Sequence, residues 1–121
     1  MSTPMNHREL REQAELLRML AHPTRLAILR ELAQGPRCVS DIQELVDVAQ
    51  SNTSQHLAAL RRHEIVDYHE SGTMRCYYVA RPKLVTQLVK LLDGDFPVVH
   101  PSAEQVKRAA ANRGRVQARA T

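Results

Sequence analysis

Two short helical segments, separated by a tight turn and followed directly by alternating residues, constrain the fold more than any other feature of the sequence. In residues 40–47 and 50–63 the apolar side chains recur with helical spacing, whereas residues 65–80 alternate around a Ser-Gly-Thr turn. Two helices joined by a short turn form a helix-turn-helix, and the alternating segment predicts a β-hairpin, or wing, that follows it.

The segments around this unit complete the predicted fold. Helices are expected at residues 6–20 and 23–34 before it and at residues 82–92 after it, with a short extended segment at residues 37–39. We therefore predict a mainly α fold class with a small β-hairpin wing. This is a winged helix-turn-helix with five core helices plus a basic C-terminal tail.

The spacing also indicates which side chains pack together. Ser40 and Gln43 are three residues apart, which predicts a capping box at the start of the third helix. The expected apolar faces are Leu10, Ala14, Leu17 and Leu20 in the first helix, Ile42, Leu45 and Val46 in the third, and Thr53, Leu57 and Leu60 in the fourth. The last core helix is apolar around most of its circumference, which indicates a partner surface that it shares with the first helix.

The second helix of the pair has the composition of a helix that reads DNA. Its first two turns contain small polar residues, Gln, Asn and one His, and no acidic residue. Asn and Gln pair with adenine edges, Ser and Thr bind bases or phosphates, and Arg binds the backbone. The predicted DNA-binding residues are Gln50, Ser51, Asn52, Thr53, Ser54, Gln55, His56, Arg61, Arg62 and, in the wing, Arg75. The alternative is an ordinary solvated polar face.

Positive charge is concentrated at one end of the chain. Lys and Arg number 17 against 13 Asp and Glu, a net charge of +4, but residues 1–96 hold twelve of each and sum to zero. The whole +4 lies from Pro97 onward. We expect residues 1–96 to form a winged helix-turn-helix domain for DNA binding and dimerisation, and residues 97–121 to form a basic, flexible tail.

The sequence also disfavours several classes of protein. No apolar stretch approaches the roughly 18 residues that span a bilayer, and the N-terminal segment is polar, so we expect a cytoplasmic protein with no membrane partner. Two cysteines cannot form a disulfide scaffold. The sequence contains neither a Gly-rich phosphate loop nor a G-x-S-x-G motif, and we expect no enzymatic activity.

Four motifs occur in order along the chain: H-P-x-R-L-x-I-L from His22, S-Q-H-L in the helix that would read DNA, L-R-x-x-x-I-V from Leu60 and G-x-x-x-x-Y-Y from Gly72. Over Leu16 to Leu92 the chain resembles the ArsR/SmtB family of bacterial winged-helix repressors. This resemblance implies a cytoplasmic homodimer that binds an imperfect palindrome in double-stranded operator DNA. It also implies release when an effector binds or a cysteine site reacts. The first and last core helices would form the dimer contact.

The sensor sites of that family are incomplete in this sequence. Its metalloid and soft-metal sensors often carry C-V-C-D-L at the start of the third helix, whereas this chain reads C-V-S-D-I from Cys38. Gln43 stands where arsenic sensors add a cysteine. One thiolate cannot form the two- or three-sulfur site that soft ions need. The family's other metal site uses Asp and His in the last core helix, where residues 82–92 contain no His.

A second cysteine, Cys76, offers a different kind of sensor. In a winged helix the short strand before the third helix usually pairs with the second wing strand, which would place Cys38 and Cys76 on neighbouring strands. Two close thiols can form a disulfide or sulfur bridge, or hold a thiophilic ion. The alternative is that each is a small buried hydrophobic residue. No cofactor is firmly predicted; the one considered is a soft metal or metalloid ion at Cys38.

The function predicted from these features is a homodimeric transcriptional repressor that binds palindromic operator DNA and is released by an effector. Thiol chemistry at Cys38 and Cys76 is the candidate trigger. One alternative is a soft-metal or metalloid sensor that uses Cys38 in an atypical site. Another is a winged-helix module that binds proteins, which the zero net charge of residues 1–96 leaves open. A constitutive repressor without an effector is the third.

Overall fold

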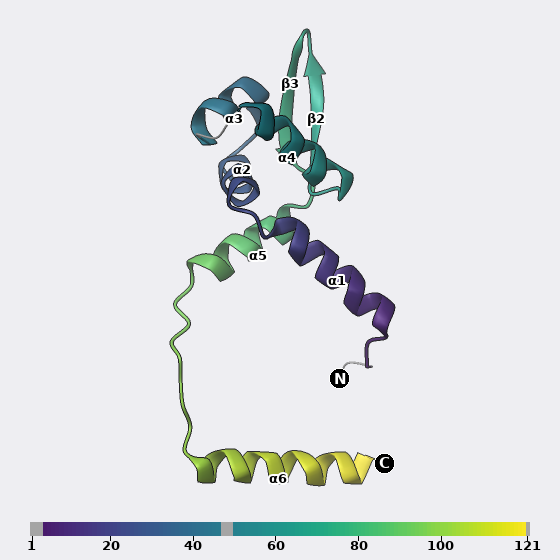
Figure 1. Cartoon of the computed structure of the whole chain (residues 1–121), viewed down its shortest axis with the longest axis vertical. Coiled ribbons are helices and arrows are strands. Elements are labelled where there is room, and N and C mark those ends of the chain that lie inside the picture. The colour runs from purple at the N-terminus through teal and green to yellow at the C-terminus, as the bar shows by residue number, and fades with distance from the viewer. Residues whose placement is uncertain (1–3, 47–49, 121) are drawn as a thin grey trace.

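A computed structural model describes residues 4–46 and 50–120, without the side chains of residues 50, 51 and 115–120. The helices are α1 (His7–Leu20), α2 (Pro23–Ala33), α3 (Val39–Val46), α4 (Gln50–Arg62), α5 (Pro82–Asp93) and α6 (Ala103–Ala120). The strands are β1 (Arg37–Cys38), β2 (Val66–Ser71) and β3 (Met74–Val79). The predicted winged helix-turn-helix, with its five core helices and hairpin, is confirmed (Figure 1).

The wing is a hairpin to which one short strand is added. Its antiparallel strands are ordered β1-β3-β2, so β1, which comes directly before α3, pairs with the second strand of the hairpin. Gly72 reverses the chain between β2 and β3 with a φ of +64°, in the left-handed region that glycine adopts without strain. The hairpin projects from the body beside α3 and α4 (Figure 1).

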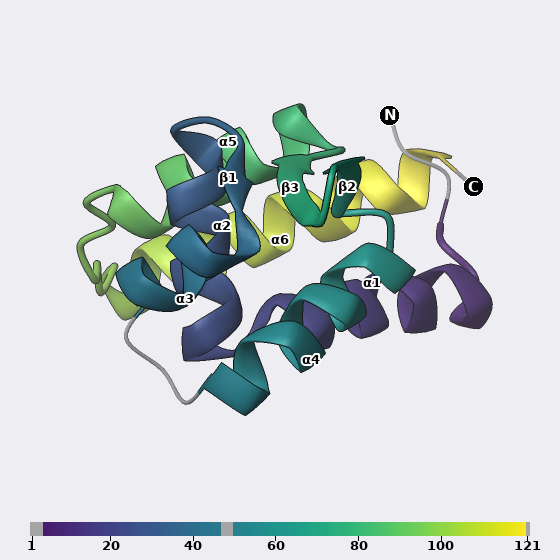
Figure 2. The same cartoon turned by 90° about the horizontal axis from the view of Figure 1, so that it is seen from above.

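The core lies where helices α2 to α5 meet the base of the sheet. Viewed from above, α2 lies between α5 on one side and α1 with α4 on the other (Figure 2). The largest fully buried apolar side chains are Ile28, Leu29, Ile42, Leu57, Leu60, Ile65, Val66 and Val85. Burial of each of these side chains contributes about 1.5–3 kcal/mol, so the core holds α4 in one orientation relative to the wing. The inward positions predicted for α4 are confirmed.

The start of α2 is capped by a histidine. His22 is the N-cap residue, and its Nδ1 accepts a hydrogen bond from the backbone N–H of Thr24 at 3.1 Å. Pro23 occupies the first position of the helix, where a missing N–H is tolerated. At the opposite end, Arg30 donates two hydrogen bonds, of 2.6 and 3.1 Å, to the carboxylate of Asp93 and so links α2 to α5.

Two predicted details of α3 differ from the structure. The helix begins at Val39, so Ser40 lies inside the first turn and is not an N-cap residue. Leu45, predicted to face inward, is exposed. The early start follows from the position of β1, because its last residue, Cys38, leads into the helix with no loop between them. Ile42 is the one side chain of this short helix that is fully buried in the core.

The first helix buries only part of its apolar face. Leu20 and Met19 enter the core, whereas Leu10, Ala14 and Leu17 remain exposed to solvent. The uncovered stripe is where a partner surface was predicted, and that role stays a prediction.

The C-terminal segment forms a helix, α6, that stands apart from the body in Figure 1. Ser102 and Gln105 form a reciprocal pair of hydrogen bonds at its start, 2.9 and 3.2 Å long, in the manner of a capping box. All its described side chains are exposed. The flexibility of the tail and the division at residue 96 stay predictions. Among the described residues, no helix combines the length and apolar character that crossing a membrane requires.

The chain leaves α4 through one residue in left-handed backbone conformation. Glu64 has a φ of +58°. Its N–H donates to the carbonyl of Arg61, and the N–H of Ile65 donates to the carbonyl of Leu60, at 2.9 and 3.0 Å. These bonds satisfy the last carbonyls of the helix and turn the chain into β2. This turn brings the C-terminal end of α4 against the base of the wing.

Candidate functional site

The polar residues at the start of α4 divide between its exposed face and the core. Asn52, Ser54 and Gln55 are exposed. Thr53 is fully buried, so its side chain does not face outward with the others. The side chains of Gln50 and Ser51 lie outside the described part of the structure. The helix therefore presents short amides and hydroxyls in its first two turns.

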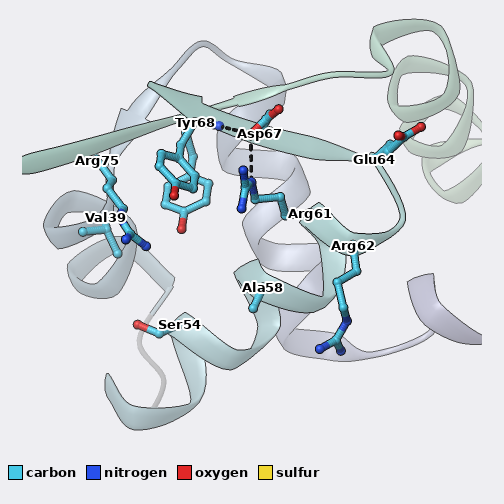
Figure 3. Close-up of a pocket in the computed structure, with 10 residues that line it drawn as sticks. Val39, Ser54, Ala58, Arg61, Arg62, Glu64, Asp67, Tyr68 and Arg75 are labelled. Carbon is cyan, nitrogen blue, oxygen red and sulfur yellow. Dashed lines mark hydrogen bonds and ion pairs between the residues drawn. The ribbon is translucent and has the colours of Figure 1, made fainter. Parts of the chain in front are cut away.

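A groove of about 530 Å³ runs between α4 and the wing. Figure 3 shows Ser54, Ala58, Arg61 and Arg62 from α4 on one side and Tyr68 and Arg75 from the wing on the other. Val39, Glu64, Asp67 and Tyr77 complete the lining. Four of the predicted DNA-binding residues, Ser54, Arg61, Arg62 and Arg75, thus lie around one groove, although they are up to 21 positions apart in the sequence.

Tyr68 holds two of these arginines. The guanidinium carbons of Arg61 and Arg75 lie 4.5 and 4.6 Å from the centre of its ring, so one aromatic side chain contacts a cation from α4 and a cation from β3. Tyr77 packs beside Tyr68, with 5.3 Å between ring centres. The sequence analysis did not identify Tyr68 as a site residue; its only signal was an aromatic position in the alternating strand.

Asp67 lowers the free positive charge of this groove. Its Oδ1 accepts hydrogen bonds from Arg61 Nε at 2.9 Å and from the backbone N–H of Tyr68 at 2.8 Å, as the dashed lines in Figure 3 show. The hydrogen bond from Arg61 holds the pKa of the Asp67 carboxyl below its usual value, and the same contact raises the pKa of Arg61. Arg62 turns away from this pair and makes no ion pair among the described residues. Arg62 is therefore a cation available to an outside anion.

His56 connects the middle of α4 to the start of α2. Arg25 Nε donates to His56 Nδ1 at 3.1 Å, and another guanidinium nitrogen of Arg25 donates to the carbonyl of Met19 at 2.8 Å. The ring centre of His22 is 4.3 Å from that of His56. Burial lowers the pKa of His56, and the nearby His22 and Arg25 lower it further. Because a neutral ring is needed to accept from Arg25, this contact holds α4 only while His56 is unprotonated.

Cys38 and Cys76 are directly opposite one another across the β1–β3 pair, which confirms the predicted adjacency. Their sulfur atoms are 2.9 Å apart in a thiol hydrogen bond, and both residues are partly buried and free of disulfide. The hydrogen bond to Cys76, together with burial, raises the pKa of the Cys38 thiol. Cys38 is followed by the first residue of α3, so the pair lies where the helix-turn-helix joins the wing.

No group of three or more His, Cys, Asp or Glu side chains converges within the residues that were described. His69 stacks on Tyr78, with 5.2 Å between ring centres, while Asp67 binds Arg61, so the histidines near the wing do not form a common site. Among the described residues, the ligands that the protein offers to a soft ion at Cys38 are therefore two sulfur atoms, those of Cys38 and Cys76.

The comparisons with known proteins agree with this geometry. The sequence model described as bacterial regulatory protein, arsR family, matches residues 22–68, from the cap of α2 into β2. The chain is 36% identical over 80 residues to the biofilm growth-associated repressor of Agrobacterium fabrum, which covers 66% of this chain and 68% of that protein. It is also 33% identical over 90 residues to the transcriptional repressor PagR of Bacillus anthracis, covering 74% and 89% of the two chains.

Solved structures give the same fold. The crystal structure of Rv0081 from Mycobacterium tuberculosis superposes with a TM-score of 0.64 at 27% identity, over 93% of this chain and 98% of that one.

Proposed function

Because this chain belongs to the ArsR family of bacterial regulatory proteins, we propose that it is a homodimeric transcriptional repressor that binds a palindromic operator. The observation that carries this proposal is the groove between α4 and the wing, where three arginines surround an exposed polar helix face. The repressor names of the two relatives support it. We propose the cytoplasm as its compartment, since operator DNA lies there in bacteria.

The N-terminal half of α4 reads the bases of the operator. Asn52 and Gln55 are exposed amides, which pair with adenine edges in the major groove, and Ser54 supplies a hydroxyl at the rim of the arginine groove. The body has no net charge, so a general positive field does not account for affinity. Recognition therefore depends on where individual side chains lie.

Arg62 and Arg75 bind the phosphate backbone on either side of that contact. Arg62 has no ion pair among the described side chains, and Arg75 lies 3.8 Å from Glu70 with its guanidinium over Tyr68. Arg61, in contrast, is held by Asp67 and fixes the angle between α4 and the wing. Each phosphate neutralised releases counterions, which makes the affinity fall with salt.

Dimerisation uses α1 and α5. Leu10 and Leu17 of α1 are 49% and 63% exposed, and Leu91 and Leu92 of α5 are 59% and 48% exposed. Isolated exposed leucines are ordinary, but four on two helices of one small domain provide apolar surface that a two-fold partner would cover. The winged helix-turn-helix domain of Mb0332 from Mycobacterium bovis is homodimeric, and it resembles this chain with a TM-score of 0.64 at 28% identity, over 77% of this chain and 91% of that one.

The cysteine pair senses two-electron oxidants. In the reaction with hydrogen peroxide, one thiolate attacks a peroxide oxygen and forms a sulfenic acid with release of hydroxide; the second thiol then displaces that hydroxyl to form the disulfide. Two thiols lose two electrons and two protons, and one peroxide becomes two waters. The sulfur atoms must approach from 2.9 Å to about 2.05 Å, which moves β1 and the start of α3 against the wing. Val39, next to Cys38, lines the DNA groove, so this movement changes its shape and releases the operator.

The test is a titration of reduced protein against DNA from upstream of its own gene and against a scrambled duplex. We expect specific binding, with Gln55→Ala weakening it and Arg62→Ala lowering the salt dependence by about one counterion. Lys83→Ala removes an exposed cation outside the groove and is the matched control. Equal affinity for both duplexes would refute the repressor and favour the protein-binding module.

The sensor is tested by repeating the titration after peroxide, arsenite, zinc or cadmium, with Cys38→Ser and Cys76→Ser in parallel. Release by peroxide that both substitutions abolish supports the thiol switch. Release by a soft ion alone replaces it with a two-sulfur ion site. Release by none of the four leaves a repressor without a thiol effector.

A further inference from the structure

The last part of the chain, residues 95–120, forms an arm that does not pack on the body. After α5 the chain runs away from the body in an extended linker, and α6 then lies apart from the other helices (Figure 1). All described residues from 95 onward are exposed. Eight linker residues span about 26 Å when extended, and the 18 residues of α6 form about 27 Å of helix. The arm is long enough to cross a neighbouring domain.

The arm carries apolar side chains that solvent would not favour. Phe96, Val98 and Val99 are 67%, 82% and 75% exposed, and Val106 follows in the first turn of α6. Val106, Ala109 and Ala110 share one face of the helix by their spacing. A single helix of this length is marginal in water, because most helical stability in proteins comes from packing of such a face. The arm therefore needs a surface to pack against.

The body leaves a matching surface uncovered. Among the described residues, eleven large apolar side chains are exposed, and eight of them lie in α1, in α5 or in the arm. Four of these eight, Leu10, Leu17, Leu91 and Leu92, belong to the proposed dimer surface, and the apolar residues of the arm begin at Phe96, four positions after Leu92.

Charge favours the same pairing. A groove of about 560 Å³ follows α1, and its lining consists of Met5, Glu9, Glu12, Gln13, Glu15, Leu16, His63 and Arg81. Glu12 and Glu15 also form exposed ion pairs with Arg8 and Arg18 of the same helix. The described cations of α6 are Lys107, Arg108 and Arg113, and the segment from residue 97 onward carries the entire net charge of the chain. A basic helix is thus available to a groove in which three carboxylates outnumber one arginine, on a body whose charges sum to zero.

The linker directs the arm away from its own body. Pro97 and Pro101 restrict it to extended backbone, and at its root the ring of Phe96 lies over Gly94, where a Cβ would come within 2.5 Å of the ring. The match to the Rv0081 structure spans 93% of this chain, whereas residues 1–96 make up about four-fifths of it. The matched part of this chain therefore includes residues of the arm. Mb0332, whose match covers 77% of this chain, is homodimeric, so the proposed dimer makes a second copy available to the arm.

We propose that the arm crosses to the second copy of this chain and packs the Val106 face of α6 along the partner subunit's α1. The inference rests on the homodimer proposed above and adds an exchanged arm to it. Each subunit then packs its arm on the other subunit, and dissociation of the dimer requires both arms to detach.

The experiment uses the full chain with a photo-crosslinking amino acid at position 106, and at position 111 as the matched control on the opposite face of α6. Light and 15N-labelled chains are mixed, irradiated and digested. We expect mixed-isotope crosslinks from position 106 to peptides of α1, and few from position 111. Crosslinks within one chain only, or equal crosslinking from both positions, would overturn the exchanged arm.

Sedimentation distinguishes failure of the arm from failure of the dimer. Val106→Glu is expected to raise the dimer dissociation constant at least about tenfold, while Ala111→Glu leaves it unchanged. A wild-type dimer that Val106→Glu does not weaken refutes the arm and leaves the proposed homodimer standing. A wild-type monomer refutes both. A Val106→Glu effect on DNA affinity with no effect on the dimer assigns the arm to DNA and also overturns the inference.

Discussion

Oxidation of the cysteine pair provides the sharpest quantitative test of the structure. Cys38 and Cys76 are directly opposed in antiparallel strands, where Cα atoms are about 4.5–5.5 Å apart. This range falls inside the roughly 4.4–6.8 Å that disulfides accept, so the bond can close with a small shift of the strands. The chain between the two residues contains α3, α4 and β2, which means that the bond would cross-link the whole helix-turn-helix.

The stabilisation follows from the length of that loop. The cysteines are 38 positions apart, and the chain-entropy relation for a loop of this size gives a loss of about 13 cal/mol/K in the unfolded state. At about 25 °C this raises the free energy of unfolding by about 3.9 kcal/mol, from which strain in the folded strands subtracts. We expect a measured gain of about 2–4 kcal/mol.

The assay is urea unfolding of the oxidised and reduced full chain, followed by circular dichroism at one protein concentration, because dimerisation also contributes to stability. Cys38→Ser and Cys76→Ser remove the bond and are the controls. They should unfold alike under oxidising and reducing conditions. An oxidised wild type that is no more stable than the reduced protein would show that the strands cannot accommodate the bond, and the reasoning from their register would be wrong.

Three further predictions concern individual side chains. Because the pKa of His56 is lowered in the folded chain, the unfolded chain binds the proton more tightly, and the free energy of unfolding should fall as the pH drops below about 6.5. Urea unfolding between about pH 7.5 and about pH 5.5 measures this decline, which His56→Gln should flatten. An unchanged slope in the variant would contradict the prediction. Cys76→Ala removes the hydrogen bond that raises the pKa of Cys38, so iodoacetamide should alkylate Cys38 faster at neutral pH, as mass spectrometry would show; an equal rate would argue against that bond. Asp93→Ala breaks an exposed ion pair with Arg30, and because water and salt screen such a pair, the melting temperature should fall only slightly; a large fall would mean that the link between α2 and α5 is more than an ion pair.

Local patterns were sufficient to predict the elements of the fold. Helical spacing and the change to alternation located α1 to α5 and the hairpin, because each rests on contacts between residues close in sequence. The adjacency of Cys38 and Cys76 was predictable for a different reason: the pairing of β1 with β3 follows from the winged-helix topology itself.

The parts of the site that sequence reasoning missed depend on contacts across the fold. Nothing in the spacing connects Arg25 to His56, which lie 31 positions apart and meet only after α2 packs against α4. The position of Tyr68 between two arginines likewise depends on the angle between the wing and α4.

The start of α6 was missed although a local signal was present. Ser102 and Gln105 have the capping-box spacing, but the few apolar residues that follow gave the segment little weight.

The left-handed residue at the end of α4 has a consequence for how such a protein would search a genome. A glycine at position 64 would relieve about 1 kcal/mol of backbone strain, yet the chain has a glutamate there, on the rim of the arginine groove and 3.8 Å from Arg81. Its carboxylate weakens the attraction of the groove for any polyanion, whatever its sequence. Decoy sites outnumber an operator by millions, so occupancy is governed by the ratio of specific to non-specific affinity. In the proposed repressor, Glu64 therefore lowers both affinities alike, which shortens the time that each copy stays on any DNA and leaves the ratio itself to the side chains of α4 that contact bases.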